Sequence, residues 1–233
     1  MLNNSKFRIP SGYERGIRFG ANWTMAISPY LILYIIMVIL ISPNDDSGNI
    51  TDILRFAGTT PTPFIATVFL DGLFHAVFFV TVATLFVILR EAFPVQASLI
   101  LVCGAWQMLF GFSKGLISSY VFPQLGSAYI AAEAALQPTF IPVASAFDAL
   151  RNALQWMDSL GVMFVWILVS LLPSSTNLPR PIRWMGWAMT FGILVPDALF
   201  PGFLLVVLIS LPWIFMLGRW MKQLTSIPNY IRE

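Results

Sequence analysis

The segment from residue 141 to residue 172 limits what this chain can fold into more than any other part of the sequence. It reads IPVASAFDALRNALQWMDSLGVMFVWILVSLL, and its second half is apolar enough to lie in lipid. The first half carries polar side chains that would fall within about 120° of arc on a helix. These are Asp148, Arg151, Asn152, Gln155, Asp158 and Ser159. Because ionisable groups in hydrocarbon cost at least a few kcal/mol each, this stripe must face other helices or a water-filled cavity. The sequence therefore predicts a polytopic membrane protein with a polar interior.

Composition points the same way. Charged residues make up only 10% of the chain and hydrophobic residues 58%, whereas soluble domains average about 25% charged residues. The net charge of +2 is too small to indicate nucleic acid as a partner. The single cysteine, Cys103, excludes a disulfide within one chain. We expect Cys103 to be a buried small hydrophobe.

Apolar runs long enough for a hydrocarbon core of about 30 Å recur along the chain. We predict an all-α transmembrane helical bundle with about six spans. The predicted spans are residues 22–42, 64–89, 97–121, 141–172, 182–195 and 202–221. Residues 1–21 form an N-terminal segment and residues 222–233 a tail. Residues 43–63 are predicted to be a polar loop, and residues 123–142 a longer connection that could contain a short interfacial helix.

Lysine and arginine residues indicate the orientation. With six spans, ten of them lie in the tails or in loops on one side: Lys6, Arg8, Arg15, Arg18, Arg90, Arg180, Arg183, Arg219, Lys222 and Arg232. The opposite side has Arg55 together with acidic residues that include Asp45, Asp46 and Asp52. Because positive charge is retained on the cytoplasmic side, both termini are predicted to be cytoplasmic. We expect the protein in a bacterial cytoplasmic membrane.

Charged residues on different spans are predicted to reach similar depths in the outer half of the bilayer, at about 1.5 Å of rise per residue. Such depth matching is what ion pairing requires. We therefore predict a buried cluster, and take the polar residues of the fourth span as further candidate ligands. The full candidate set is Asp71, His75, Lys114, Asp148, Arg151, Asn152, Gln155 and Asp158. Two interpretations stay open: ion pairs that only hold helices together, or a site for a solute, an ion or a proton.

Catalytic chemistry has weaker support in the sequence. Asp71 and His75 are four residues apart and share a helix face, so the aspartate could orient the imidazole for acid–base work. A zinc site needs at least three protein ligands, which one histidine and one distant cysteine do not supply. No serine-nucleophile motif occurs. We assign no catalytic residue, no metal and no cofactor.

Gly111 and Gly115 form a GxxxG pattern inside the third predicted span. Two glycines one turn apart make a groove that allows another helix to approach closely. We expect this groove to serve internal packing, because the neighbouring Lys114 should point inward. A dimer face is the alternative.

Residues 178–187, LPRPIRWMGW, lead into the last predicted pair of helices. This entry resembles that of the domain-of-unknown-function 4386 family of small bacterial six-helix membrane proteins. The chain is also similar to that family in its long polar loop after the first span. The small and polar residues of the fourth span, here residues 144–161, add to the likeness. The resemblance covers most of the chain in layout and about ten residues in motif. It implies an all-helical fold and supplies no activity, substrate or catalytic residues.

Three functions are therefore open. The first is a non-enzymatic accessory or structural membrane protein, whose partners are the lipid bilayer and a second protein or a second copy. The second is a small transporter or sensor that binds a polar solute or a proton at the cluster. The third is a membrane enzyme that uses Asp71 and His75. A water-accessible cavity lined by the cluster would favour the second or the third over the first.

Overall fold

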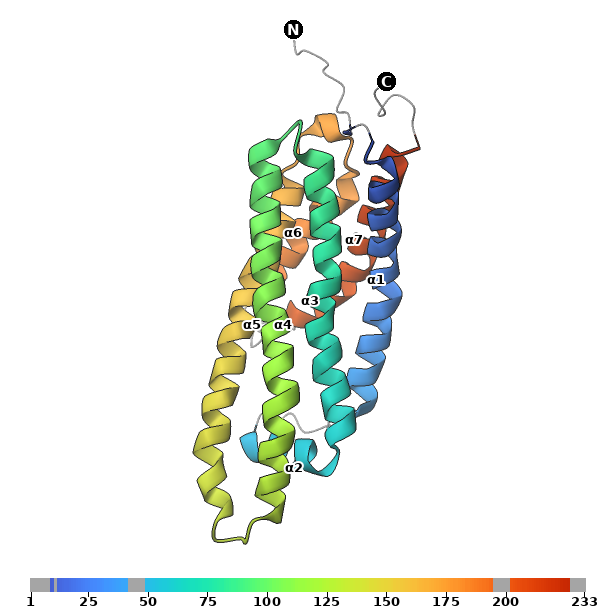
Figure 1. The fold of residues 1–233 in the computed structure, drawn as a ribbon. Helices are drawn as coiled ribbons and strands as arrows, with labels where there is room; N and C mark the ends of the chain where they lie inside the picture. Colours follow the sequence, from blue (N-terminus) through green and yellow to red (C-terminus); the bar gives the residue numbers. More distant parts are fainter. Residues whose placement is uncertain (1–8, 11, 42–48, 195–201, 227–233) are drawn as a thin grey trace. The chain divides into compact units, whose positions relative to one another are not determined.

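The computed structural model describes residues 9–10, 12–41, 49–194 and 202–226. Over these residues the chain is helical and has no strand, so the predicted all-α class is confirmed (Figure 1). The helices are α1 (Glu14–Ile41), α2 (Ile50–Thr59), α3 (Pro61–Leu89), α4 (Pro94–Ala131), α5 (Phe140–Ser170), α6 (Arg180–Leu194) and α7 (Gly202–Leu224), with 3-10 turns η1 (Gln137–Thr139) and η2 (Ser174–Thr176).

Among the described residues, four helical segments are long and apolar enough to cross a membrane. They are Glu14–Met37 in α1, all of α3, all of α4, and Gln137–Ser170, which includes α5. The α6 helix has 15 residues, fewer than the about 20 that a hydrocarbon core requires. The count of six spans and the placement of the termini therefore remain predictions.

Two helices extend beyond the predicted spans. The α1 helix begins at Glu14, ahead of the predicted span that starts at residue 22. The α4 helix continues through Pro123 to Ala131, into the predicted connection of residues 123–142. A proline removes one helical hydrogen bond. Around Pro123, however, Phe122 and Tyr129 are buried in apolar clusters, and this packing offsets the loss.

The α2 helix lies within the predicted polar loop and was missed. Asn49 caps its first turn, because the Asn49 side chain accepts a hydrogen bond of 3.1 Å from the backbone N–H of Thr51. Leu54 and Ala57 are fully buried. These apolar positions recur with the helical period, so α2 is amphipathic and is held by its apolar face.

The chain divides into two compact units. Unit 1 draws on Met1–Leu31, Val77–Gln107 and Ser159–Glu233, and unit 2 on Ile32–Ala76 and Met108–Asp158. The helices α3, α4 and α5 each contribute one stretch to each unit.

Unit 1 contains α6 and α7, which pack against each other. The buried indole of Trp213 on α7 donates a hydrogen bond of 3.0 Å to the carbonyl of Ile182 on α6. Trp220 on α7 donates in the same way to the carbonyl of Thr176, at 3.3 Å. Cys103, on the α4 stretch of this unit, is only partly buried, in contrast to the full burial expected.

Unit 2 has its own apolar core where α2 meets α4 and α5. Leu54, Tyr129 and Ala144 form one buried cluster, one residue from each of these helices. The backbones of α2 and α4 also approach closely, since a Cβ added at Gly126 would lie 2.6 Å from the amide nitrogen of Gly58.

Candidate functional site

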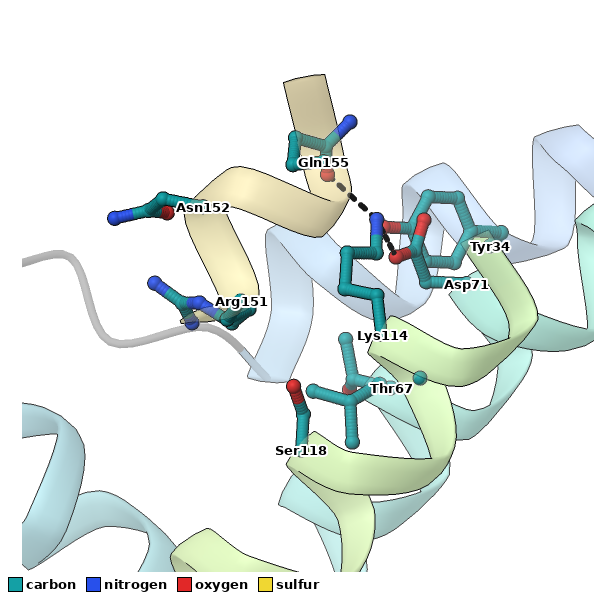
Figure 2. Close-up of a pocket in the computed structure, with 10 residues that line it drawn as sticks. Tyr34, Thr67, Asp71, Lys114, Ser118, Arg151, Asn152 and Gln155 are labelled. Carbon is teal, nitrogen blue, oxygen red and sulfur yellow. Dashed lines mark hydrogen bonds and ion pairs between the residues drawn. The ribbon is translucent and has the colours of Figure 1, made fainter. Parts of the chain in front are cut away.

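Lys114 joins three helices of unit 2. Its ammonium lies 2.5 Å from Oδ2 of Asp71 on α3, and donates a hydrogen bond of 2.5 Å to Oε1 of Gln155 on α5. Figure 2 shows the two contacts meeting at the end of the lysine side chain. The lysine side chain is 8% exposed and the aspartate side chain 26%. Burying an unpaired ammonium to this extent would cost free energy, because the charge loses its contact with water. The contacts with Asp71 and Gln155 offset that cost.

Arg151 and Asp148 form a second ion pair within α5. Nη2 of Arg151 lies 2.6 Å from Oδ1 of Asp148, and the amide of Asn152 donates to Oδ2 of the same carboxylate at 3.1 Å. The guanidinium also lies 5.7 Å from the ring centre of Phe122 on α4, within cation–π range. The carboxylate and the ring together hold the arginine in place.

A direct backbone contact sets the position of α3 against α4. A Cβ added at Gly115 would lie 2.6 Å from Cα of Gly72 and 2.9 Å from the carbonyl oxygen of Val68. Gly111, one turn earlier, leaves room for the imidazole ring of His75. The GxxxG groove therefore serves internal packing, as expected. The contact brings Asp71 and Lys114, each adjacent in sequence to one of the touching glycines, across from each other.

A pocket of about 250 Å³ opens beside Lys114. Five of the eight predicted site residues line it: Asp71, Lys114, Arg151, Asn152 and Gln155. Figure 2 shows that α4 and α5 supply most of the labelled side chains and that α1 and α3 complete the lining. Of the six residues in the predicted polar stripe of the fourth span, three line this pocket: Arg151, Asn152 and Gln155.

His75 and Asp158 form a separate buried pair. Nδ1 of His75 lies 3.0 Å from Oδ1 of Asp158, and the two residues are 6% and 2% exposed. Neither is among the residues that line the pocket. The sequence suggested Asp71 as the group that orients the imidazole, whereas the partner at Nδ1 is Asp158 on α5.

Five lining residues were not predicted as part of the site: Tyr34, Thr67, Val68, Gly115 and Ser118. For Ser118 a signal existed, because it follows Lys114 by four residues and so shares its helix face. Ser118 is 2% exposed. Its hydroxyl has no hydrogen-bond partner among the described residues.

The donor set suits a polar organic molecule better than a metal ion. In the part of the chain that the structure describes, no three His, Cys, Asp or Glu side chains lie close enough to hold a metal. The pocket instead offers ammonium, guanidinium, amide and hydroxyl groups.

Comparison with known proteins finds no matching family model, no matching curated protein and no matching solved structure.

Proposed function

We propose that this chain is an integral membrane protein that binds a small polar solute in the pocket beside Lys114. Four helical segments long and apolar enough to cross a bilayer support the membrane assignment. The one-sided distribution of lysine and arginine supports six spans with both termini in the cytoplasm of a bacterial cell. Membership of the domain-of-unknown-function 4386 family, suggested by residues 178–187, also remains a proposal.

The observation that carries the proposal is that the charged cluster borders a cavity. Ion pairs that only hold helices together need no space beside them, and interiors are normally close-packed. Here about 250 Å³ lies against Lys114, Arg151 and Gln155. Ligand sites are concave and use a small number of placed polar groups to orient the ligand. A transporter or a sensor would both use it.

The enzyme hypothesis gains less from this geometry. Asp71 is paired with Lys114, and His75 lies against Asp158 outside the pocket lining. An accessory or structural role is the alternative that a closed interior would favour.

Water access to the pocket separates the alternatives. In a Cys103→Ser background, Ser118→Cys should react with a hydrophilic methanethiosulfonate reagent on the protein in vesicles, and a solute that fills the pocket should slow the reaction. Ser170→Cys is the matched control, because Ser170 is buried and does not line the pocket. If Ser118→Cys reacts no faster than Ser170→Cys, the interior is closed and the solute-binding proposal fails.

A further inference from the structure

Arg151 brings hydrogen-bond donors to the pocket. Two cations, Lys114 and Arg151, contribute to the lining, and one carboxylate, Asp71. Asp148 is not among the lining residues and balances the charge of Arg151 from behind it. The guanidinium carries five N–H donors, and its one ion pair among the described residues is with Asp148. The guanidinium therefore has N–H donors left for a ligand in the pocket.

Ser118 adds a hydroxyl that lacks a partner. Buried serines in helices usually bond to a carbonyl of the preceding turn, and the adjacent Ser119 does so, donating to the carbonyl of Leu116 at 3.0 Å. Ser118 has no such bond although it is 2% exposed. Figure 2 shows its oxygen directed away from α4, toward the region between Arg151 and Lys114. A buried hydroxyl is seldom left unpaired, so this geometry indicates a group that accepts a hydrogen bond from Ser118 when the pocket is filled.

We propose that the pocket binds the carboxylate group of a small monovalent organic acid, held by Arg151 and Ser118. This inference rests on the proposed solute-binding function and names its ligand class. A guanidinium fork and a hydroxyl at a second point match the two oxygens of a carboxylate better than a spherical halide. Asp71, whose side chain is 26% exposed, faces the same space and disfavours a dianion such as phosphate. The volume of about 250 Å³ far exceeds the about 10–15 Å³ that one water molecule requires.

Calorimetric titration of the full chain in detergent tests the ligand class. Propionate should bind, and propionamide, its neutral isostere, and chloride should bind at least about tenfold more weakly, because a hydrogen bond to a charged group is stronger than one to a neutral group. Ser118→Ala should weaken propionate binding about tenfold or more. Thermal unfolding should show that Ser118→Ala is folded, since the hydroxyl that it removes has no partner. Ser119→Ala, whose hydroxyl bonds within its own helix, should bind propionate like the parent chain.

A carboxylate can come from water or, as a fatty acid, from the bilayer, so laurate is titrated beside propionate. Tighter binding of laurate that also depends on Ser118 identifies a lipid source, and equal or weaker binding a water-soluble acid. Propionate that does not bind, or that binds Ser118→Ala unchanged, overturns the carboxylate assignment. If propionamide binds instead, the assignment fails while the proposed solute-binding function survives. If Ser118→Cys is also unreactive in vesicles, both fail.

Discussion

Lys114 shows how one buried charge depends on its neighbours. It meets a carboxylate from α3 and an amide from α5, and its own side chain is 8% exposed. Removing either charged member of such a pair leaves the other buried without compensation, whereas removing both leaves no charge behind.

Because the Asp71 side chain is 26% exposed, we expect Lys114→Met to lower the stability of the protein in detergent by less than the about 3–5 kcal/mol that breaking a fully buried pair costs. Adding Asp71→Asn should restore much of the loss, and thermal unfolding of the single and double variants forms a cycle that isolates their coupling. Lys114→Met with Asp148→Asn is the control, because Asp148 pairs with Arg151. A double variant with Asp71→Asn that is no more stable than Lys114→Met would refute the pairing.

Among the helices, α3 and α4 leave no room for a side chain at the point where Gly72 meets Gly115. Alanine favours helix over glycine by about 1 kcal/mol, so a Gly→Ala change is expected to stabilise a helix wherever space permits. At Gly115 the new Cβ would lie 2.6 Å from the Cα of Gly72, and the two helices would have to separate.

Gly115→Ala should thus destabilise the protein by about 1–3 kcal/mol, the usual cost of overpacking. Gly16→Ala is the matched control, because a Cβ at Gly16 on α1 meets no atom within 4 Å. Melting temperatures in detergent should fall for Gly115→Ala and should stay level or rise for Gly16→Ala. Equal responses of the two variants would show that α3 and α4 are not in backbone contact.

The end of α5 depends on Arg183 of α6. Its guanidinium donates to the carbonyls of Ser170 at 3.3 Å and Pro173 at 3.1 Å, and also to that of Leu172. These carbonyls lie at or just past the last turn of α5, where intrahelical partners run out. The planar guanidinium of Arg183 thus supplies hydrogen-bond donors to the carbonyl groups at the C-terminal end of α5.

Arg183→Lys keeps the charge but loses the fork. We expect a loss of about 1.5–3 kcal/mol, the range for hydrogen bonds to charged groups, measured by chemical or thermal unfolding. Arg180→Lys, at an exposed position on the same helix, should change stability little. If both variants unfold alike, the guanidinium does not stabilise the end of α5.

Most of the helices could be predicted from the apolar runs, because a span needs a long hydrophobic segment. The α2 helix could not be found this way, since it is short and Asp52 and Arg55 interrupt it, although its apolar residues follow the helical period. Pro123 was interpreted as a break because local chemistry disfavours it, and packing in unit 2 overrides that preference.

For the site, depth along the helices was enough to place Asp71 and Lys114 in one cluster. It was not enough to match His75 with Asp158 or to bring Ser118 to the pocket. Those contacts depend on the rotation of each helix about its axis, which the approach of Gly72 to Gly115 helps to fix. The apolar periodicity of one helix does not determine how that helix is rotated relative to its neighbours.

For the whole molecule, the orientation in the membrane can be tested with single cysteines at the two ends of α5. In a Cys103→Ser background, Ala135→Cys should be labelled by an impermeant maleimide added to intact cells, and Ser175→Cys only after permeabilisation. Both positions are exposed in the structure, so access depends on the side of the membrane. The reverse pattern would invert the proposed topology, and labelling of both from outside would contradict the crossing by α5.

The length of α4 has a consequence for where ligands can enter. With 38 residues, at about 1.5 Å of rise each, it measures about 57 Å. A hydrocarbon core of about 30 Å therefore covers little more than half of it. Counted from Pro94, a rise of about 30 Å ends near Lys114, one turn before Ser118. If the first turn of α4 lies at one face of the hydrocarbon core, we expect the thickness of the lipid to decide whether the two side chains lie in hydrocarbon or among headgroups.

The length of the lipid chains should therefore change the water access of the pocket without any change in the sequence. In vesicles of phosphatidylcholine with myristoyl, oleoyl or erucoyl chains, modification of Ser118→Cys should slow as the chains lengthen. The same protein would then be open in a thin membrane and closed in a thick one. A rate that is identical in all three lipids would place the pocket wholly outside the hydrocarbon, where its charges meet water directly.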